Sequence, residues 1–397
     1  MSARRNAVAA AAGGVLLFLA SCLAIRGGLL DSAPYGDVHL YREYGQNMAH
    51  GQWPYTFFDE YPPLAQPLFW FVTLLPGSYA AAFKWTMALF GAGAVALLVA
   101  ALASVRASRT RIVVAAATAG VAPLFVGRIF LNAYDLWPAF LVAAALVAFV
   151  RRHERVAYVL LALGVAAKVY PVVLLPLALV ETYERGGREQ VRRSLAWFAG
   201  VLVLVHVPFA IMGPGGLRFS YWIQLKRGLE IESLGGSILL VLGRLGVYHV
   251  TAATQSPSST DVLGPLADAI GTVSTLLELG AVLLVAWLFW RRRRLPLVAA
   301  AAAVLAFMAF GKVFSPQYVD WLVPLVPAAG PVAAAGTLAV AALTHGVFDR
   351  FSAPGGPNGA AYKSALTWWV FARDLTVLAL YVLLVALLAR RPRSSSP

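Results

Sequence analysis

Long apolar runs, rather than alternating apolar and polar positions, dominate the chain. Runs rich in Ala, Leu and Val are long enough to cross a hydrocarbon core about 30 Å thick, so they predict membrane-spanning helices. Strands of an outer-membrane barrel would instead alternate apolar and polar residues. The predicted spans are residues 7–25, 82–104, 112–127, 129–150, 194–211, 266–290, 295–310 and 365–389.

Four other apolar stretches are short or interrupted by proline: residues 64–76, 156–183, 237–247 and 319–347. The first and third are too short to span and favour re-entrant or interfacial segments. Pro171 lies at the midpoint of the second, which predicts two crossings there, with Lys168 and Tyr170 at the outer turn. The fourth is expected to form two short spans broken near Pro327. We therefore expect an all-α polytopic membrane protein with about 10 to 12 crossings.

Composition and charge agree with a membrane protein. The chain is 60% hydrophobic and 13% charged, whereas a soluble domain carries about a quarter charged residues. The net charge of +14 comes from Lys and Arg gathered in short connectors, which the positive-inside rule places in the cytoplasm. Such scattered clusters suit anionic membrane lipids and argue against nucleic acid as a partner. The basic connectors are residues 4–5, 106–111, 151–155, 185–193, 291–294 and 390–393.

The remaining loops then lie outside the cytoplasm, notably residues 26–63, 212–265 and 348–364. We expect residues 1–390 to form a single transmembrane domain and 391–397 to be a disordered cytoplasmic tail. The one cysteine, Cys22, ends a lipoprotein-like Leu-Ala-Ser-Cys sequence, or simply belongs to the first span.

The loop at 26–63 holds the densest set of groups capable of chemistry. Asp37 precedes a stretch of helical spacing that Gly51 ends, so it occupies an N-cap position and could also serve as a catalytic base. Asp59 and Glu60 precede the stiff Tyr61-Pro62-Pro63 sequence. They are either an interfacial carboxylate pair beside an aromatic belt or ligands for substrate hydroxyl groups.

A second polar group marks the start of the predicted span at 129–150. Arg128, Asn132 and Asp135 are spaced i, i+4, i+7, which places them on one face of a helix. Ionisable residues at this depth usually face a partner or a cavity. The spacing therefore allows either an Arg128–Asp135 ion pair that stabilises the bundle or a contact with substrate.

Three cations complete the inventory. Lys168 and Lys312 have apolar flanks and are each followed closely by Tyr and Pro. They either snorkel to the interface or, together with Arg227, form a cationic pocket for a phosphate. Arg227 belongs to the charged run at 226–233, which could equally be a solvated loop. The sequence has no phosphate-binding Gly-x-x-x-x-Gly-Lys motif, and His39 beside Asp37 is too small a cluster to predict a metal.

Several segments, in order between about residues 31 and 330, resemble glycosyltransferase family 87, the polyprenyl-phosphate-sugar-dependent mannosyltransferases of the GT-C class. The matching segments are Gly36–Tyr41, Gly51–Tyr55, Glu60–Leu64, Tyr134–Ala139, Lys168–Pro171 with Leu174–Pro176, Arg227–Ser233 and Lys312–Tyr318. The residue before Tyr134 is often basic in the family and is Ala133 here.

The resemblance implies a GT-C-like bundle in the cell membrane that transfers a sugar with inversion at the extracytoplasmic face, with Asp37 as the base. The donor would be polyprenyl-phospho-mannose, a substrate rather than a cofactor, and the acceptor a cell-envelope glycolipid or polysaccharide. Neither a cofactor nor a metal is implied. Five aromatic residues could stack on sugar rings or simply anchor the chain at the membrane interface: Tyr41, Trp53, Tyr55, Tyr61 and Tyr170. The residues expected to bind substrate are Asp59, Glu60, Tyr61, Arg128, Asp135, Lys168, Tyr170, Arg227, Glu230, Lys312 and Gln317.

Other functions remain open at this point. The donor could be another lipid-linked sugar, such as polyprenyl-phospho-arabinose. A transporter or lipid flippase would place its charges near the bilayer midplane and often contains inverted repeats. A scaffold without activity would leave the outer carboxylates and cations unused. The gathering of these charges at the outer ends of the predicted helices favours the transferase.

Overall fold

The computed structural model describes residues 2–29, 36–256, 259–292, 295–351 and 366–390. Within these ranges, seven helices are long and apolar enough to cross a membrane, so the protein is an all-α polytopic membrane protein. The helices of the bundle are α1 (Ser2–Arg26), α4 (Tyr79–Ser104), α5 (Arg109–Val126), α6 (Leu136–Val150), α7 (Glu154–Ala167), α8 (Leu175–Met212), α11 (Pro265–Arg292), α12 (Pro296–Phe310), α14 (Pro331–Phe351) and α15 (Leu366–Ala389). The predicted tail at 391–397 and most of the loop at 348–364 lie outside the described residues.

Serine caps and small residues explain how the first helices begin and pack. The hydroxyls of Ser78 and Ser108 accept hydrogen bonds from the backbone at the first turns of α4 and α5. Gly14 of α1 approaches α5 so closely that a Cβ there would lie 3.0 Å from the Cβ of Ala116. Small residues allow helices in a membrane to approach in this way. Cys22 is buried within α1.

Proline and glycine break the bundle at the predicted second stretch. α7 ends at Ala167, and Lys168 has an extended backbone before η2 (Tyr170–Leu174) begins. α8 then turns at Gly187, whose φ of 65° is readily adopted only by glycine. The predicted break at Lys168–Pro171 is therefore confirmed. The predicted basic connector at 185–193 contains the turn at Gly187, which joins the two helical stretches that make up α8.

Two predicted spans differ from the structure. The span at 129–150 begins only at Leu136, after the short helix η1 (Gly127–Leu131). The first half of 319–347 contains only α13 (Val319–Leu322) and η4 (Val326–Ala329), because its prolines cannot donate helical hydrogen bonds. The predicted total of 10 to 12 crossings stays a prediction.

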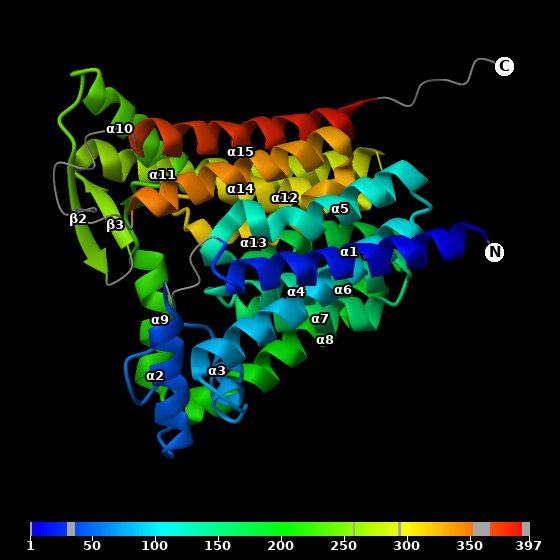
Figure 1. Ribbon diagram of the computed structural model, residues 1–397, viewed down its shortest axis with the longest axis horizontal. Coiled ribbons are helices and arrows are strands. Elements are labelled where there is room, and N and C mark those ends of the chain that lie inside the picture. The colour runs from blue at the N-terminus through cyan, green and yellow to red at the C-terminus, as the bar shows by residue number, and fades with distance from the viewer. Residues whose placement is uncertain (1, 30–35, 257–258, 293–294, 352–365, 391–397) are drawn as a thin grey trace.

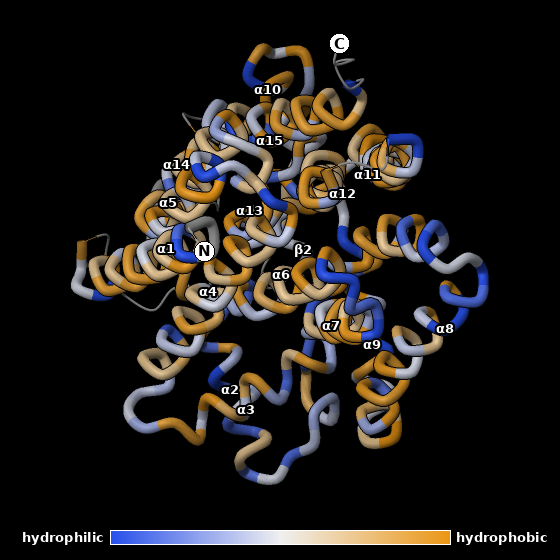
Figure 2. The backbone as a smooth tube through the Cα atoms, turned by 90° about the vertical axis from the view of Figure 1, so that its right-hand side faces the viewer, coloured by the Kyte–Doolittle hydropathy of each residue, from blue (hydrophilic) through white to orange (hydrophobic). Residues whose placement is uncertain are grey.

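The basic connectors gather at one end of the bundle. The Arg151 side chain donates to the hydroxyl of Ser104, 3.1 Å away, which joins the connector at 151–155 to the end of α4. Arg185 donates to the carbonyl of Phe149, and Arg111 donates to that of Ala328. The first turns of α1 and the last turns of α15 lie at this same end (Figure 1). Seen from there, hydrophobic helices appear end on with hydrophilic turns between them (Figure 2).

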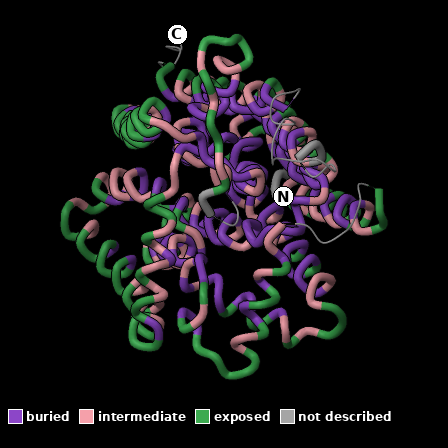
Figure 3. The backbone as a smooth tube through the Cα atoms, turned by 90° about the vertical axis from the view of Figure 1, so that its left-hand side faces the viewer, coloured by how far each residue is buried: buried purple, intermediate pink, exposed green. Residues whose placement is uncertain are grey.

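The opposite end carries the elements of the two long loops, together with α3 (Figure 1). These are α2 (Val38–Ala49), α3 (Ala65–Thr73), α9 (Pro214–Lys226), α10 (Leu234–Arg244), β1 (Leu229–Glu230), β2 (Thr251–Ser256) and β3 (Ser259–Leu263). The strands form an antiparallel sheet in the order β1-β3-β2. The sequence did not predict this sheet, because strands of two to six residues leave almost no periodic signal. Viewed from this end, buried residues occupy the centre of the bundle and exposed ones its rim (Figure 3).

Candidate active site

Asp37 and Tyr61 are joined at the end of the bundle that carries the long loops. Asp37 occupies the N-cap position of α2, as predicted, but its side chain makes no capping hydrogen bond. Instead, its Oδ2 accepts a hydrogen bond of 2.8 Å from the hydroxyl of Tyr61. Asp37 itself is only partly buried. The loop therefore orients a carboxylate that solvent and substrate can still reach.

An aromatic cluster holds the Tyr61 ring. The rings of Tyr41, Phe69 and Tyr134 lie with their centroids 5.3–5.5 Å from that of Tyr61, each near edge-on. Tyr41 stacks in turn on Phe69 at 4.5 Å. Because such pairs come from α2, α3 and the segment before α6, the phenol is fixed from several directions. The faces of Tyr41 and Tyr61 are covered by protein, so neither ring is placed to stack on a sugar.

Asp59 and Glu60 are buried, with exposures of 1% and 7%. Both carboxylates are therefore enclosed by protein rather than exposed at the surface. Asp59 Oδ1 accepts a hydrogen bond of 2.9 Å from the backbone N–H of Tyr61, and burial raises the pKa of Asp59 to about 7. Burial and then Asp37 raise the pKa of Glu60, while the charges of Arg227 and Lys168 lower it. Glu60 thus lies within the electrostatic reach of the candidate base and of two cations.

Lys168 is fixed by Asp135. The two side chains form an ion pair of 2.6 Å, and Trp321 Nε1 donates to the same oxygen of Asp135 at 2.7 Å. The Lys168 ammonium also lies 4.9 Å from the centre of the Tyr134 ring. Asp135 is fully buried, whereas Lys168 retains 16% exposure. Its ammonium has three hydrogen-bond donors, so it can donate to a second group while it remains bonded to Asp135.

The expected helical face of Arg128, Asn132 and Asp135 is wrong, because η1 and a turn precede α6. Asn132 donates to the Arg128 carbonyl at 2.6 Å. Asp135 pairs with Lys168 rather than with Arg128, the partner that the spacing suggested.

Glu230 connects the second loop to the segment after α12. Its Oε1 pairs with Arg227 at 3.1 Å, and its Oε2 accepts from the backbone N–H of Phe314 at 2.7 Å. Its own N–H donates to the carbonyl of Lys312 at 2.9 Å. Burial raises the pKa of Glu230 to about 7. Residues 229–233 are all buried, so the charged run is not a solvated loop.

The cations approach the site from different segments. Lys168 and Arg227 both lower the pKa of Glu60. Burial lowers the pKa of Lys312, and Asp261 opposes that effect. The Lys312 ammonium donates to the carbonyl of Leu225 at 3.1 Å. The structure therefore places Glu60 within electrostatic range of Asp37, Lys168 and Arg227, and Lys312 within range of Arg227.

The other expected contacts are less central. Tyr170 is stacked on Trp321 at 3.8 Å, which covers one face of its ring. Gln317 is half-buried on η3 (Pro316–Tyr318). Tyr55 is buried and donates to the carbonyl of Tyr61, while Trp53 is 59% exposed.

The two loops contact each other beside the site. The amide of Gln224 on α9 donates to the carbonyl of Glu60 at 3.4 Å. The rings of Phe58 and Phe219 lie 5.5 Å apart. The start of α9 also abuts Tyr55, because a Cβ at Gly213 would lie 2.7 Å from the Tyr55 Cβ. The site is consequently a joint product of both loops.

Sequence reasoning missed Trp321 and Arg373. Trp321 bonds to Asp135, and Arg373 on α15 is fully buried beside Glu232. Only Arg373 left a usable signal, because a charged residue within a long apolar stretch is costly and usually has a partner.

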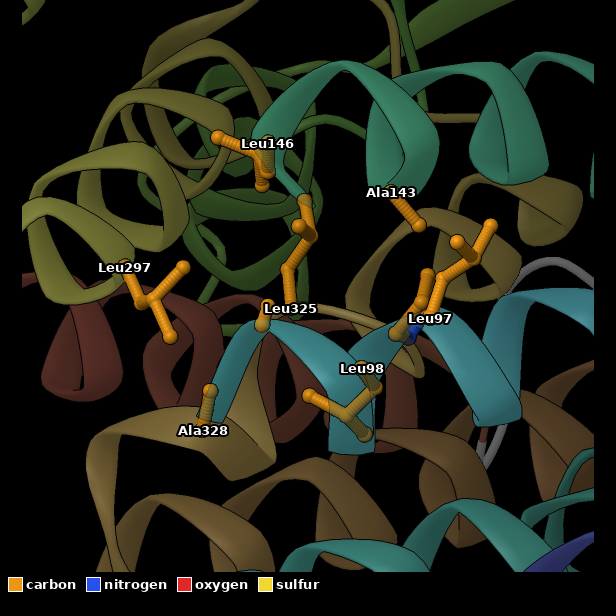
Figure 4. Close-up of a pocket in the computed structure, with 9 residues that line it drawn as sticks. Leu97, Leu98, Ala143, Leu146, Leu297, Leu325 and Ala328 are labelled. Carbon is orange, nitrogen blue, oxygen red and sulfur yellow. The ribbon is translucent and has the colours of Figure 1, made fainter. Parts of the chain in front are cut away.

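A separate pocket between α4, α6, α12 and η4 is lined only by Leu, Ala and Pro (Figure 4). Leu97, Leu146 and Leu297 are among its lining residues. It contains no side chain capable of acid, base or charge chemistry.

The fold and the site define a class: a polytopic membrane protein with carboxylates and cations converging at one end of its helical bundle. The model of glycosyltransferase family 87 matches residues 58–316, well over half of the chain. The chain therefore belongs to glycosyltransferase family 87, and it is a membrane glycosyltransferase that acts on a sugar donor and an acceptor. A comparison with curated proteins finds no match. Family membership sets aside the transporter and the scaffold, and the matched region includes Lys168 and Arg227 but begins after Asp37.

Proposed function

We propose that the protein transfers mannose from a polyprenyl-phosphate-linked donor to a cell-envelope glycolipid or polysaccharide, with inversion at the anomeric carbon. The observation that carries this proposal is the Tyr61–Asp37 hydrogen bond beside Lys168 and Arg227. It supplies an oriented carboxylate and two positive charges at one place. The donor is a substrate, and the proposal requires no cofactor.

Asp37 acts as the general base. Its Oδ2 is occupied by Tyr61, which leaves Oδ1 for the acceptor hydroxyl. As the acceptor oxygen attacks the anomeric carbon, its proton passes to Asp37. The bond between that carbon and the phosphate oxygen breaks, and its electron pair leaves with the lipid phosphate. One base is sufficient for this direct displacement.

Lys168 and Arg227 stabilise the leaving phosphate. The negative charge on the phosphate grows as the bond breaks, and prearranged cations lower the energy of that state more than that of the bound donor. Asp135 and Glu230 hold the two cations in place through buried ion pairs. Glu60, which interacts electrostatically with both cations and with Asp37, binds a sugar hydroxyl in this proposal.

The site acts at the extracytoplasmic face of the cell membrane. Its elements lie at the end of the bundle opposite the basic connectors (Figure 1). The positive-inside rule assigns those connectors to the cytoplasm. The interface at the other end is where the phosphate of a lipid-linked donor resides. Residues 1–390 serve in this proposal as one GT-C-like domain.

The test is transfer of radiolabelled mannose from synthetic polyprenyl-phospho-mannose in membranes that contain the protein. We expect labelled product with wild type and with Glu43→Gln, a matched change at an exposed carboxylate of the same helix. We expect none with Asp37→Asn. Equal product from all three would reject Asp37 as the base. Product from polyprenyl-phospho-arabinose, with none from polyprenyl-phospho-mannose, would show that the donor sugar is arabinose.

A further inference from the structure

Arg373 is a fully buried arginine on α15, in the half of that helix nearer the candidate site. Its side chain is 0% exposed. Its Nη1 pairs with Glu232 Oε2 at 2.8 Å, and its Nη2 donates to the backbone carbonyl of Glu232. Its Nε and Nη2 also bond to Asp374 Oδ1 at 3.1 and 3.0 Å. The guanidinium therefore joins α15 to the second loop through its two hydrogen bonds to Glu232, while its two bonds to Asp374 lie within α15.

Arg373 also contacts the segment that follows α12. Its Cζ lies 3.9 Å from the centre of the Phe314 ring, a close cation–π contact. The backbone N–H of Phe314 is the group that donates to Glu230 Oε2. Glu230 in turn pairs with Arg227 through its other oxygen. A continuous path of direct contacts thus runs from Arg373 through Phe314 and Glu230 to Arg227.

The chemistry of this path requires arginine. Glu232 and Asp374 are both buried, and a buried carboxylate without a partner is strongly unfavourable. A guanidinium can bond to both carboxylates and to a carbonyl while its flat face packs on a ring, whereas a lysine ammonium has no planar fork. Arg373 lies outside the residues matched by the family model.

We propose that Arg373 is a positioning residue: it holds Phe314 and Glu232 so that Glu230 presents Arg227 to the donor phosphate. The inference rests on the proposed function for the role of Arg227. The ordering of residues 227–233 and 312–318 by Arg373, however, can be measured without any donor.

The experiment compares wild type with Arg373→Lys, which keeps the charge and loses the fork. Arg185→Lys is the matched control, because Arg185 forms ion pairs with Glu154 and Glu181 at the opposite end of the bundle. Two readouts are taken on the full chain in detergent: hydrogen exchange at 227–233 and 312–318, and the Kd for radiolabelled polyprenyl phosphate. If Arg373→Lys does not fold, Glu232→Gln replaces it, since that change removes one partner of Arg373.

We expect Arg373→Lys to speed exchange in both segments and to raise the Kd about tenfold or more, because a small displacement of a charged group weakens binding steeply. Arg185→Lys should leave both readouts at wild-type values. Faster exchange with unchanged Kd, or no change in either readout, would overturn the inference. If Arg227→Gln leaves the Kd unchanged, the proposed function fails, and the exchange rates still decide whether Arg373 orders the two segments.

Discussion

Tyr61 and Asp37, 24 residues apart in the chain, are joined by a hydrogen bond of 2.8 Å from phenol to carboxylate. The tyrosine belongs to a stiff Tyr-Pro-Pro sequence, and the aspartate occupies the N-cap position of α2. Their contact converts a residue in an N-cap position into an oriented carboxylate. The proposed catalysis depends on this pair. The hydroxyl group of Tyr61 can be removed while its ring is kept.

Tyr61→Phe tests the pair directly. We expect kcat for transfer to fall about tenfold to a hundredfold, because a hydrogen bond to a charged group contributes about 1.5–3 kcal/mol. Thermal stability should fall by no more than this contribution, because the ring remains packed. Tyr44→Phe is the matched control: Tyr44 is also buried, and its hydroxyl has no hydrogen-bond partner among the residues that the structure describes. Equal kcat for the two variants would contradict the role of Tyr61.

Lys168→Met is expected to destabilise the protein by about 3–5 kcal/mol, because it leaves Asp135 buried without its counter-charge. Adding Asp135→Asn should recover most of this loss, since the amide oxygen can still accept from Trp321. Thermal unfolding in detergent measures both changes. A single variant as stable as wild type would show that the ion pair does not hold Lys168. Transfer should stay low in the double variant, which lacks the cation.

Stability should fall as pH rises from about 4 to about 7, in part because of Asp59. Burial raises its folded pKa to about 7 from 3.8, so the unfolded state loses its proton first. The unfolded state then binds fewer protons in this window, which makes the slope of stability against pH negative, by at most on the order of 4 kcal/mol in total. Unfolding temperatures across this range should vary less for Asp59→Asn than for wild type. If the unfolding temperature of Asp59→Asn varied with pH as much as that of wild type, the raised pKa of Asp59 would be contradicted. Glu43→Gln serves as the control at an exposed carboxylate.

Gly45 and Gly200 should respond to alanine in opposite ways. Alanine normally stabilises a helix relative to glycine by about 1 kcal/mol. A Cβ at Gly45 would collide with the carbonyl of Phe69 on α3, so Gly45→Ala should lower the unfolding temperature and transfer activity by shifting α2. A Cβ at Gly200 would meet nothing within 4 Å, so Gly200→Ala should be neutral or stabilising. An unchanged unfolding temperature in Gly45→Ala would show that α2 can move without cost.

The sequence by itself determined the class of fold and the helices that proline and glycine end or interrupt. Apolar length is a local property, so spans such as α4 and α15 could be read directly, as could the break at Lys168–Pro171. The position of Asp37 at the start of a helix was also local. The resemblance to the family depended on short ordered motifs, and the family match confirms it.

Only the tertiary structure decided which charged groups meet. Asp135 could pair with Arg128 by spacing, yet it bonds to Lys168, because η1 ends the helical register before α6. The burial of Asp59 and Glu60 and the contacts of Arg373 depend on segments far apart in the chain. A buried charge is stable only beside a suitable partner, and a partner more than a hundred residues away has no local signature. The short strands of the second loop likewise form only because β1, β2 and β3 pair with one another.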